Sequence, residues 1–282
     1  MKFYYLAILL INLLGAIDVC ARDCETDVIK TEKRLATNLE YINYVISGNR
    51  SGHDLTNTYY TVSVCYAVLG NYDSAIYYLP KDHTSLVNLD DIFYEECQIT
   101  HSWKKAAELI VADFKSKHSN LKNLDLAMEL TRLSGREQSV MWYGFYLQKG
   151  SSCDKLKLAH QQLHKKAKLI LESLKGKDYP TVNDIGAEGM KSLFLLIQHS
   201  DDNVALQKLF KSKMEAALKK QTYTDTLLIT QLAFLTDRVL VNEKKLQEYG
   251  TQFDESHHLL PIRDAINVNT RRLLVFLAPL NK

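Results

Sequence analysis

Apolar residues recur at helical spacing through nearly the whole chain after about its first twenty residues. Strand-like alternation bounded by turn residues is hard to find. The chain has 282 residues, 46% of them hydrophobic, which is enough for a sizeable core in one large or two ordinary domains. The pattern predicts an all-α fold with helices near 24–47, 56–69, 72–80, 90–98, 101–118, 122–133, 136–148, 153–174, 184–200, 202–219, 224–247 and 268–276.

The first residues have the composition of a secretory signal peptide. Lys2 precedes an apolar run from Phe3 to Ile17, and Val19-Cys20-Ala21 provides a small-residue cleavage pattern. The run is too short for a comfortable transmembrane helix, so we expect cleavage after Ala21, with an uncleaved anchor as the alternative. The sequence therefore predicts an exported protein, periplasmic or secreted, with no transmembrane segment once residues 1–21 are removed.

Cysteines and histidines give no metal or redox motif. Cleavage would remove Cys20, and the cysteines that remain can pair in three ways or stay as buried free thiols. Their spacing forms no CxxC unit, and the chain has no HExxH pair. The adjacent His257-His258 is most simply a solvated loop. We therefore predict no metal and no cofactor. The remaining cysteines are Cys24, Cys65, Cys97 and Cys153.

The overall charge argues against a polyanionic partner. Lys plus Arg number 35 and Asp plus Glu number 33, for a net charge of +2. A field this weak selects neither nucleic acid nor an anionic membrane. We predict no nucleic-acid partner.

The stretch YYTVSVCYAVLGNYDSAIYYL resembles one tetratricopeptide repeat. Such a repeat begins with an aromatic, has a small residue where its two helices approach, turns at Gly-x-Tyr, and has Ala at the crossing. A repeat unit cannot bury its face alone, so the resemblance implies helical hairpins on either side and a groove for a peptide or protein partner. A generic helical hairpin is the alternative, and Pro80 departs from the repeat. The matching residues are Tyr59, Ser63, Tyr66, Gly70, Tyr72 and Ala75.

The character of the helices changes near residue 121, where longer amphipathic helices begin. We place a boundary there, between a helical-repeat-like region at 22–120 and an α-helical domain at 121–282. No linker separates the two, so we expect them to pack together.

Polar residues gather at four points of the second half. Asp237 and Arg238 interrupt an apolar helix, where a buried ion needs either an internal network or a ligand. His199 ends another apolar helix, either as a partner of the helix dipole or as a general acid or base. Gly250 suits the left-handed position after a helix, and such a turn could present its neighbours to a cleft. The four groups are Arg136-Glu137-Gln138, Gln198-His199-Ser200-Asp201, Thr236-Asp237-Arg238 and Tyr249-Gly250-Thr251-Gln252.

From Tyr179 onward the chain resembles a bacterial family filed as domain of unknown function 6624. The resemblance rests on the order and spacing of several short motifs, with Tyr179 where the family has Trp. It implies a site but no reaction. The motifs are Asp178-Tyr179-Pro180, Gln198-His199-Ser200-Asp201, Gln207, Leu235-Thr236-Asp237-Arg238-Val239, Tyr249-Gly250-Thr251-Gln252, Arg271-Arg272 and Leu277-Ala278-Pro279-Leu280.

Two functions compete on these residues. The first is an exported helical-repeat protein with a polar cleft in its C-terminal domain, binding a peptide, a protein or a polar ligand. The second is a cell-envelope enzyme, hydrolase-like or transferase-like. His199 would be its acid or base, Arg238 would hold an anionic group, and Asp237 or Asp201 would orient His199 or a water. The ligand-binding residues expected in either case are Gln138, Gln198, Asp201, Gln207, Tyr249, Gly250, Thr251, Gln252 and Arg271.

Overall fold

The structure, a computed structural model, describes residues 28–47, 55–81, 85–147, 154–220, 225–254 and 256–280. The predicted signal peptide, Cys24 and Cys153 lie outside these ranges. Within them the chain forms α-helices, short 3₁₀ helices and two isolated β-bridges, with no strand, so the all-α prediction is confirmed. No helix in these ranges is long and apolar enough to cross a membrane.

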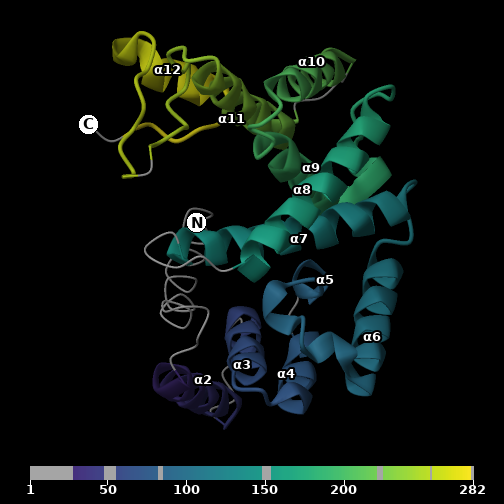
Figure 1. The fold of residues 1–282 in the computed structure, drawn as a ribbon. Helices are drawn as coiled ribbons and strands as arrows, with labels where there is room; N and C mark the ends of the chain where they lie inside the picture. The colour runs from purple at the N-terminus through teal and green to yellow at the C-terminus, as the bar shows by residue number, and fades with distance from the viewer. Residues whose placement is uncertain are drawn as a thin grey trace. The chain divides into compact units, whose positions relative to one another are not determined.

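Contacts divide the chain into two compact units, Met1–Lys165 and Lys166–Lys282. Residue 121, near which a boundary is predicted from the sequence, lies between α6 (His101–Lys117) and α7 (Leu124–Leu147). The helix α7 packs on α5 (Ser85–Asn88) of the first unit. Figure 1 shows the elements of the first unit in purple to teal and those of the second in green to yellow.

Most helices that begin in the first unit are joined by short connections. The last of them, α8, continues into the second unit. They are α2 (Val28–Ser47), α3 (Thr56–Val68), α4 (Tyr72–Tyr78), η1 (Leu79–Lys81), α5 (Ser85–Asn88), η2 (Ile92–Tyr94), η3 (Cys97–Ile99), α6 (His101–Lys117), α7 (Leu124–Leu147) and α8 (Asp154–Leu174). Those of the second unit are α9 (Val182–Gln198), α10 (Val204–Lys220), α11 (Thr226–Asn242), η4 (Ala265–Asn267) and α12 (Val268–Leu274).

The helical hairpin of α3 and α4 has the close crossing that the repeat-like pattern predicts. Buried Ser63 donates its hydroxyl to the carbonyl of Ala75 at 2.6 Å, which only a small side chain allows. Gly70, with φ 74°, ends α3, where the N–H of Asn71 reaches the carbonyl of Tyr66 at 2.9 Å. The hairpin geometry is observed, while its assignment as a tetratricopeptide repeat stays a prediction.

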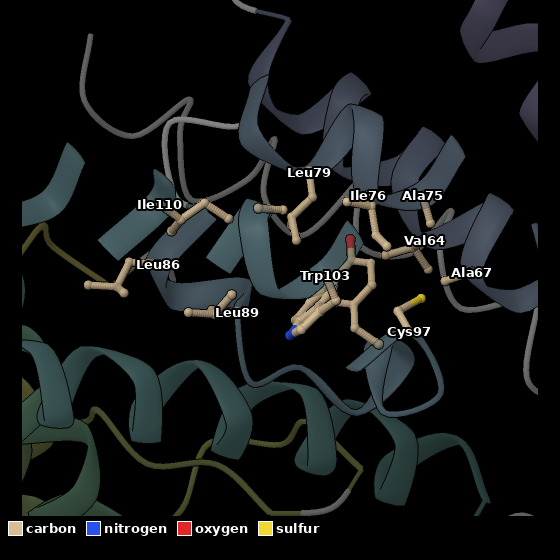
Figure 2. Packing of buried hydrophobic residues seen from close by; sticks show 12 residues of the cluster. Val64, Ala67, Ala75, Ile76, Leu79, Leu86, Leu89, Cys97, Trp103 and Ile110 are labelled. Atoms are coloured by element: carbon tan, nitrogen blue, oxygen red, sulfur yellow. The ribbon is translucent and has the colours of Figure 1, made fainter. Parts of the chain in front are cut away.

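The hydrophobic core of the first unit lies where α3, α4, α5 and α6 meet (Figure 2). Trp103 packs on Tyr94 with ring centroids 5.6 Å apart. Their contacts join the hairpin to α6, which gives the hairpin the apolar cover that it cannot supply itself. The other buried members of the core are Val64, Ala67, Ala75, Ile76, Leu79, Leu86, Leu89, Cys97, Ala106 and Ile110.

Two cysteines of the first unit form no disulfide in the structure. Cys65 and Cys97 are both buried and both free. Burial raises the pKa of each thiol to about 11, so both stay protonated near neutral pH. The buried-thiol alternative therefore holds for these two.

Two helix predictions in the first unit were wrong. The break predicted between 133 and 136 does not exist, because α7 runs through Gly135. A Cβ at Gly135 would lie 1.6 Å from the carbonyl oxygen of Val87, so glycine lets α5 approach α7 without ending the helix. The helix predicted at 90–98 is two 3₁₀ turns, η2 and η3.

The helices of the second unit begin and end at identifiable signals. Asp184 accepts hydrogen bonds from the N–H and the hydroxyl of Thr181, at 2.8 and 2.7 Å, at the start of α9. Gly186, with φ 72° and ψ 169°, kinks the first turn of that helix. Asp225 caps α11 by accepting the N–H of Leu228 at 2.9 Å.

The end of α11 differs from its prediction. The helix ends at Asn242 rather than near 247, and Lys244 takes the left-handed conformation with φ 58°. The N–H of Lys244 bonds to Val241 at 2.9 Å and that of Lys245 to Leu240 at 2.8 Å, which together form a Schellman motif. Gly250 therefore does not cap this helix.

Candidate functional site

Asp237 holds the loop that follows α11. Its side chain is fully buried on the helix. It accepts the backbone N–H of Glu248 at 2.7 Å, of Tyr249 at 3.0 Å and of Thr251 at 3.0 Å, and the Thr251 hydroxyl at 3.0 Å. A carboxylate offers about four lone-pair directions, so this set fills it. Asp237 satisfies its charge with the loop, and no acceptor site is left for orienting His199 or a water.

Gln247 and Gln252 tie the same loop from inside. The fully buried Gln247 side chain accepts the N–H of Gln252 at 2.9 Å and donates to the carbonyls of Gln252 and Leu260, at 3.0 and 2.6 Å. Gln252 donates its own amide to the Thr251 hydroxyl at 3.0 Å. The Gln252 side chain is 5% exposed, so it serves the loop and does not face a cleft.

Two arginines of α12 bind the same loop from the C-terminal side. Arg272 donates to the carbonyls of Tyr249, Gly250 and Ala278 at 2.7, 3.1 and 2.6 Å. Burial lowers the pKa of Arg272, and the Asp237 carboxylate opposes this effect electrostatically. The polar motifs at 237, 247–252 and 272 thus form one network, which we call the loop brace.

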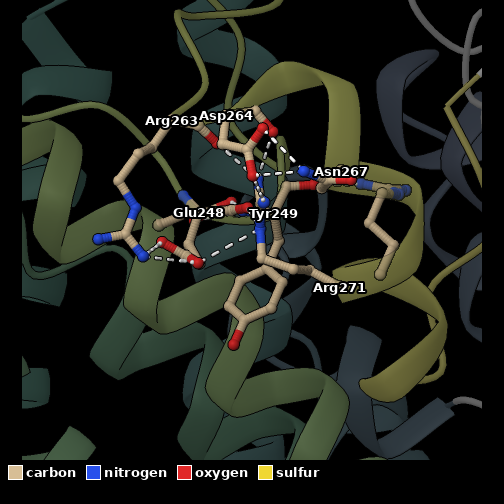
Figure 3. Close-up of polar contacts among 8 residues, drawn as sticks. Glu248, Tyr249, Arg263, Asp264, Asn267 and Arg271 are labelled. Carbon is tan, nitrogen blue, oxygen red and sulfur yellow. Dashed lines mark hydrogen bonds and ion pairs between the residues drawn. The ribbon is translucent and has the colours of Figure 1, made fainter.

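Arg271 extends the loop brace towards the surface (Figure 3). Its guanidinium donates to the carbonyls of Glu248 and Asp264, at 2.9 and 3.0 Å, and pairs with the Asp264 carboxylate at 3.2 Å. The Glu248 carboxylate pairs with Arg263 at 2.7 Å. Arg271 therefore holds the backbone, and its predicted ligand role finds no support in these contacts.

Gly250 is needed because the loop passes close to two apolar side chains. It has φ 68°, and a Cβ would lie 2.7 Å from Ile262 and 2.9 Å from Leu280. Both the left-handed backbone and the close contact favour glycine. Its role is packing of the loop.

Tyr249 differs from its neighbours, because its phenol points away from the contacts drawn in Figure 3. Burial raises the pKa of the Tyr249 phenol, and the carboxylates of Glu248 and Asp237 raise it further. The phenol is therefore a neutral hydrogen-bond donor near neutral pH.

A second polar cluster lies where the turn after α9 meets α10 and α11. One oxygen of Asp201, Oδ1, accepts from Asn242 at 2.8 Å and from Gln207 at 3.2 Å, and stands 3.5 Å from Nε of Arg238. Gln207 is fully buried and also donates to the carbonyl of Gln198 at 2.9 Å. We call Asp201, Gln207, Arg238 and Asn242 the α9–α11 cluster.

Arg238 is the cation of this cluster, and it has few hydrogen-bond partners. Its Nε is buried and has no hydrogen-bond partner among the described residues, and the ion pair with Asp201 is long at 3.5 Å. Its side chain keeps 26% exposure and that of Asp201 keeps 47%. The pair can therefore be reached from solvent, and the Arg238 guanidinium has donor capacity for an anionic group.

His199 and Gln198 stand next to this cluster in the sequence. His199 is the residue that follows α9, and its N–H bonds to the carbonyl of Leu195 at 2.9 Å. Its side chain is half-buried. A histidine at a helix C-terminus is favoured by the dipole, so this position fits the simpler alternative for His199.

The predicted site residues thus divide among three places. Gln138 lies on α7 in the first unit, half-buried, and its Nε2 has no hydrogen-bond partner among the described residues. Gln247, Asn242 and Arg272 were not among the predicted site residues. Arg272 could have been found as the second residue of the Arg271-Arg272 pair, while no local pattern marks the other two.

Comparison with known proteins agrees with the resemblance seen in the sequence. The model of a family of unknown function, DUF6624, matches residues 159–282, so the resemblance is confirmed over the C-terminal part of the chain. That range contains the loop brace and the α9–α11 cluster. A search of curated proteins found no match, and neither did a search of solved structures.

Proposed function

We propose that this is an exported ligand-binding protein whose C-terminal part recognises an anionic group through Arg238. The observation that carries the proposal is the contrast among three arginines of the same unit. Arg271 and Arg272 each donate several hydrogen bonds to backbone carbonyls, while Arg238 has one long ion pair. A partly buried guanidinium without hydrogen-bonded acceptors gains most from a ligand that supplies them.

The cluster around Arg238 suits a small polar ligand. Asn242 and Gln207 both donate to Oδ1 of Asp201, and the side chains of Asp201 and Arg238 both keep part of their surface exposed. A ligand carboxylate or phosphate would bind the guanidinium, and a ligand amine or hydroxyl would bind the free edge of Asp201. The expected ligand is therefore a small molecule or chain end that carries an anionic group beside a hydrogen-bond donor.

The enzyme alternative has less support. It needs a carboxylate that orients His199 or a water, and the oxygens of Asp237 are taken by the N–H groups of Glu248, Tyr249 and Thr251. Asp201 is the acidic group that remains for that role. Binding without turnover is the function that these contacts favour.

The first unit fits the same proposal. The hairpin of α3 and α4 carries an exposed aromatic side chain, Tyr77 at 63% exposure, which offers a contact for a peptide or protein partner. Export is supported by the composition of the first residues.

The test is thermal unfolding of the mature chain with titrated inorganic phosphate and, separately, with trialanine and its C-terminal amide. We expect one of the two anions to raise the midpoint in wild type, with binding weakened about tenfold or more in Arg238→Gln, the loss expected for a hydrogen bond to a charged group. Trialanine amide tests whether a carboxylate is what is recognised.

Arg263→Gln is the matched control, because Arg263 is 69% exposed and pairs only with Glu248 among the described residues. It should bind like wild type. Equal binding by wild type and Arg238→Gln, or no saturable binding of either anion, would reject the proposal. Turnover of a substrate that is lost with His199→Ala would favour the enzyme instead.

A further inference from the structure

A pair of histidines on α8 has the spacing of a chelating site. His160 and His164 are four residues apart on this helix, so their side chains lie one turn apart on one face. Their Nε2 atoms are 3.2 Å apart and their ring centroids 4.3 Å apart. The two nitrogens therefore lie close together on one face of the helix.

That distance fits two ligands of one metal ion. Imidazole nitrogens bind Zn²⁺ at about 2.0–2.1 Å, so nitrogens 3.2 Å apart would subtend about 100° at the ion. That value lies between the angles of about 90° and 109° of octahedral and tetrahedral coordination. An ion bound to both nitrogens would replace the hydrogen-bond contact between them.

The surroundings favour a cation in this place. The carboxylate of Glu137, on α7, is close enough to raise the pKa of His160 electrostatically, although burial and the neighbouring His164 lower that pKa on balance. Glu137 is 5% exposed, so its charge is poorly screened by solvent. A carboxylate near a pair of imidazoles is an arrangement that stabilises a bound divalent ion.

The site is also open enough for water to complete the coordination. His160 is exposed and His164 is half-buried. No group of three or more His, Cys, Asp or Glu side chains able to hold a metal occurs among the described residues, so protein side chains supply two ligands and solvent the rest.

We infer that His160 and His164 form a two-histidine site on α8 for a borderline divalent transition metal such as Zn²⁺, Ni²⁺ or Cu²⁺. Imidazole nitrogen suits these ions, and Cu²⁺ should bind most tightly of the three. The prediction of no metal rested on the lack of CxxC and HExxH units and on the adjacent pair His257-His258, and it did not weigh the pair on α8. This inference is independent of the Arg238 proposal.

The experiment is calorimetric titration of the mature, untagged chain with Zn²⁺ and with Cu²⁺. Wild type should bind one ion of either metal per chain, and His160→Ala and His164→Ala should each weaken binding at least tenfold. Both positions accept Ala within a helix, so the variants should fold. The spectrum of bound Cu²⁺ should show two nitrogen ligands in wild type and one in either variant.

His101→Ala and the double change His257→Ala with His258→Ala are the matched controls. Both should bind as wild type does. Binding that survives His160→Ala and His164→Ala unchanged, or that disappears with the His257 and His258 changes, would place the metal elsewhere and overturn the inference. Absence of saturable binding of both ions would overturn it too.

Discussion

Thr251 gives both its backbone N–H and its hydroxyl to one oxygen of Asp237, Oδ2, each at 3.0 Å. The two residues are fourteen positions apart, on a helix and on a loop. Two donors from one residue fix both its backbone and its side chain against the carboxylate. The polar motif is therefore an internal support at this point, and the proposed binding group is its neighbour Arg238.

Asp237→Asn should destabilise the protein strongly. The amide group would bring an N–H towards backbone N–H donors and would leave at least one of them without an acceptor. We expect a loss of about 3–5 kcal/mol in the free energy of unfolding. Urea denaturation measures it. Asp202 is an exposed carboxylate on the turn between α9 and α10, and Asp202→Asn should change the free energy of unfolding by less than about 0.5 kcal/mol. Similar effects of the two changes would contradict the loop brace.

Gly135→Ala tests the helix crossing in the first unit. The added methyl would meet the carbonyl oxygen of Val87 at 1.6 Å, so α5 and α7 must separate. We expect a loss of about 2 kcal/mol or more, in the range of overpacked cores. Gly176→Ala has nothing within 4 Å of its new methyl and should be neutral or slightly stabilising. If Gly135→Ala were as stable as wild type, the crossing would be looser than described.

The buried carboxyl of Asp91 predicts an unusual pH dependence. Burial raises its pKa to about 6, against the lowering effect of its hydrogen bonds from the Phe93 N–H and the Tyr60 hydroxyl. Because the folded pKa is above the unfolded value, the folded state binds the proton more tightly. The contribution of Asp91 to stability therefore rises as the pH falls from about 7 to 4 and is lost as the pH rises through 6.

The comparison with Asp91→Asn isolates this effect. The asparagine can keep an acceptor for Phe93 and can donate to Tyr60, so it resembles the protonated acid. Wild type should gain stability relative to the variant between pH 7 and pH 5, by about 1 kcal/mol or more. Parallel pH profiles for the two proteins, measured by urea denaturation, would show that Asp91 is ionised like an exposed carboxyl.

The long helices could be predicted from the sequence because apolar spacing is a local signal. The helices at 101–117 and 154–174 end within one or two residues of their predictions. The wrongly predicted helix ends depend on contacts between residues that are far apart in the sequence. Gly135 suggests a break in the helix, but the backbone of Val87 explains the glycine there. The helix α11 ends at Asn242, with Lys244 in place of a glycine in the left-handed position after it.

Some members of the polar network could be picked out from the sequence, but its arrangement could not. Asp237 and the residues from Tyr249 to Gln252 attract notice because polar groups in apolar surroundings need partners. Which partner each one has depends on a contact across the loop, and sequence spacing does not reveal it. The separation of Arg238 from its neighbour Asp237 is the clearest case, since adjacent helical residues face about 100° apart and serve different partners.

The most direct test of the account compares the thermal unfolding of Arg272→Gln and Arg238→Gln without ligand. Arg272 holds three backbone carbonyls, and its loss should lower the midpoint by several degrees. Arg238 has one long ion pair, and its loss should change the midpoint by no more than about a degree or two. An equal, large fall in both variants would make Arg238 part of the loop brace and would contradict its role as the exposed binding group.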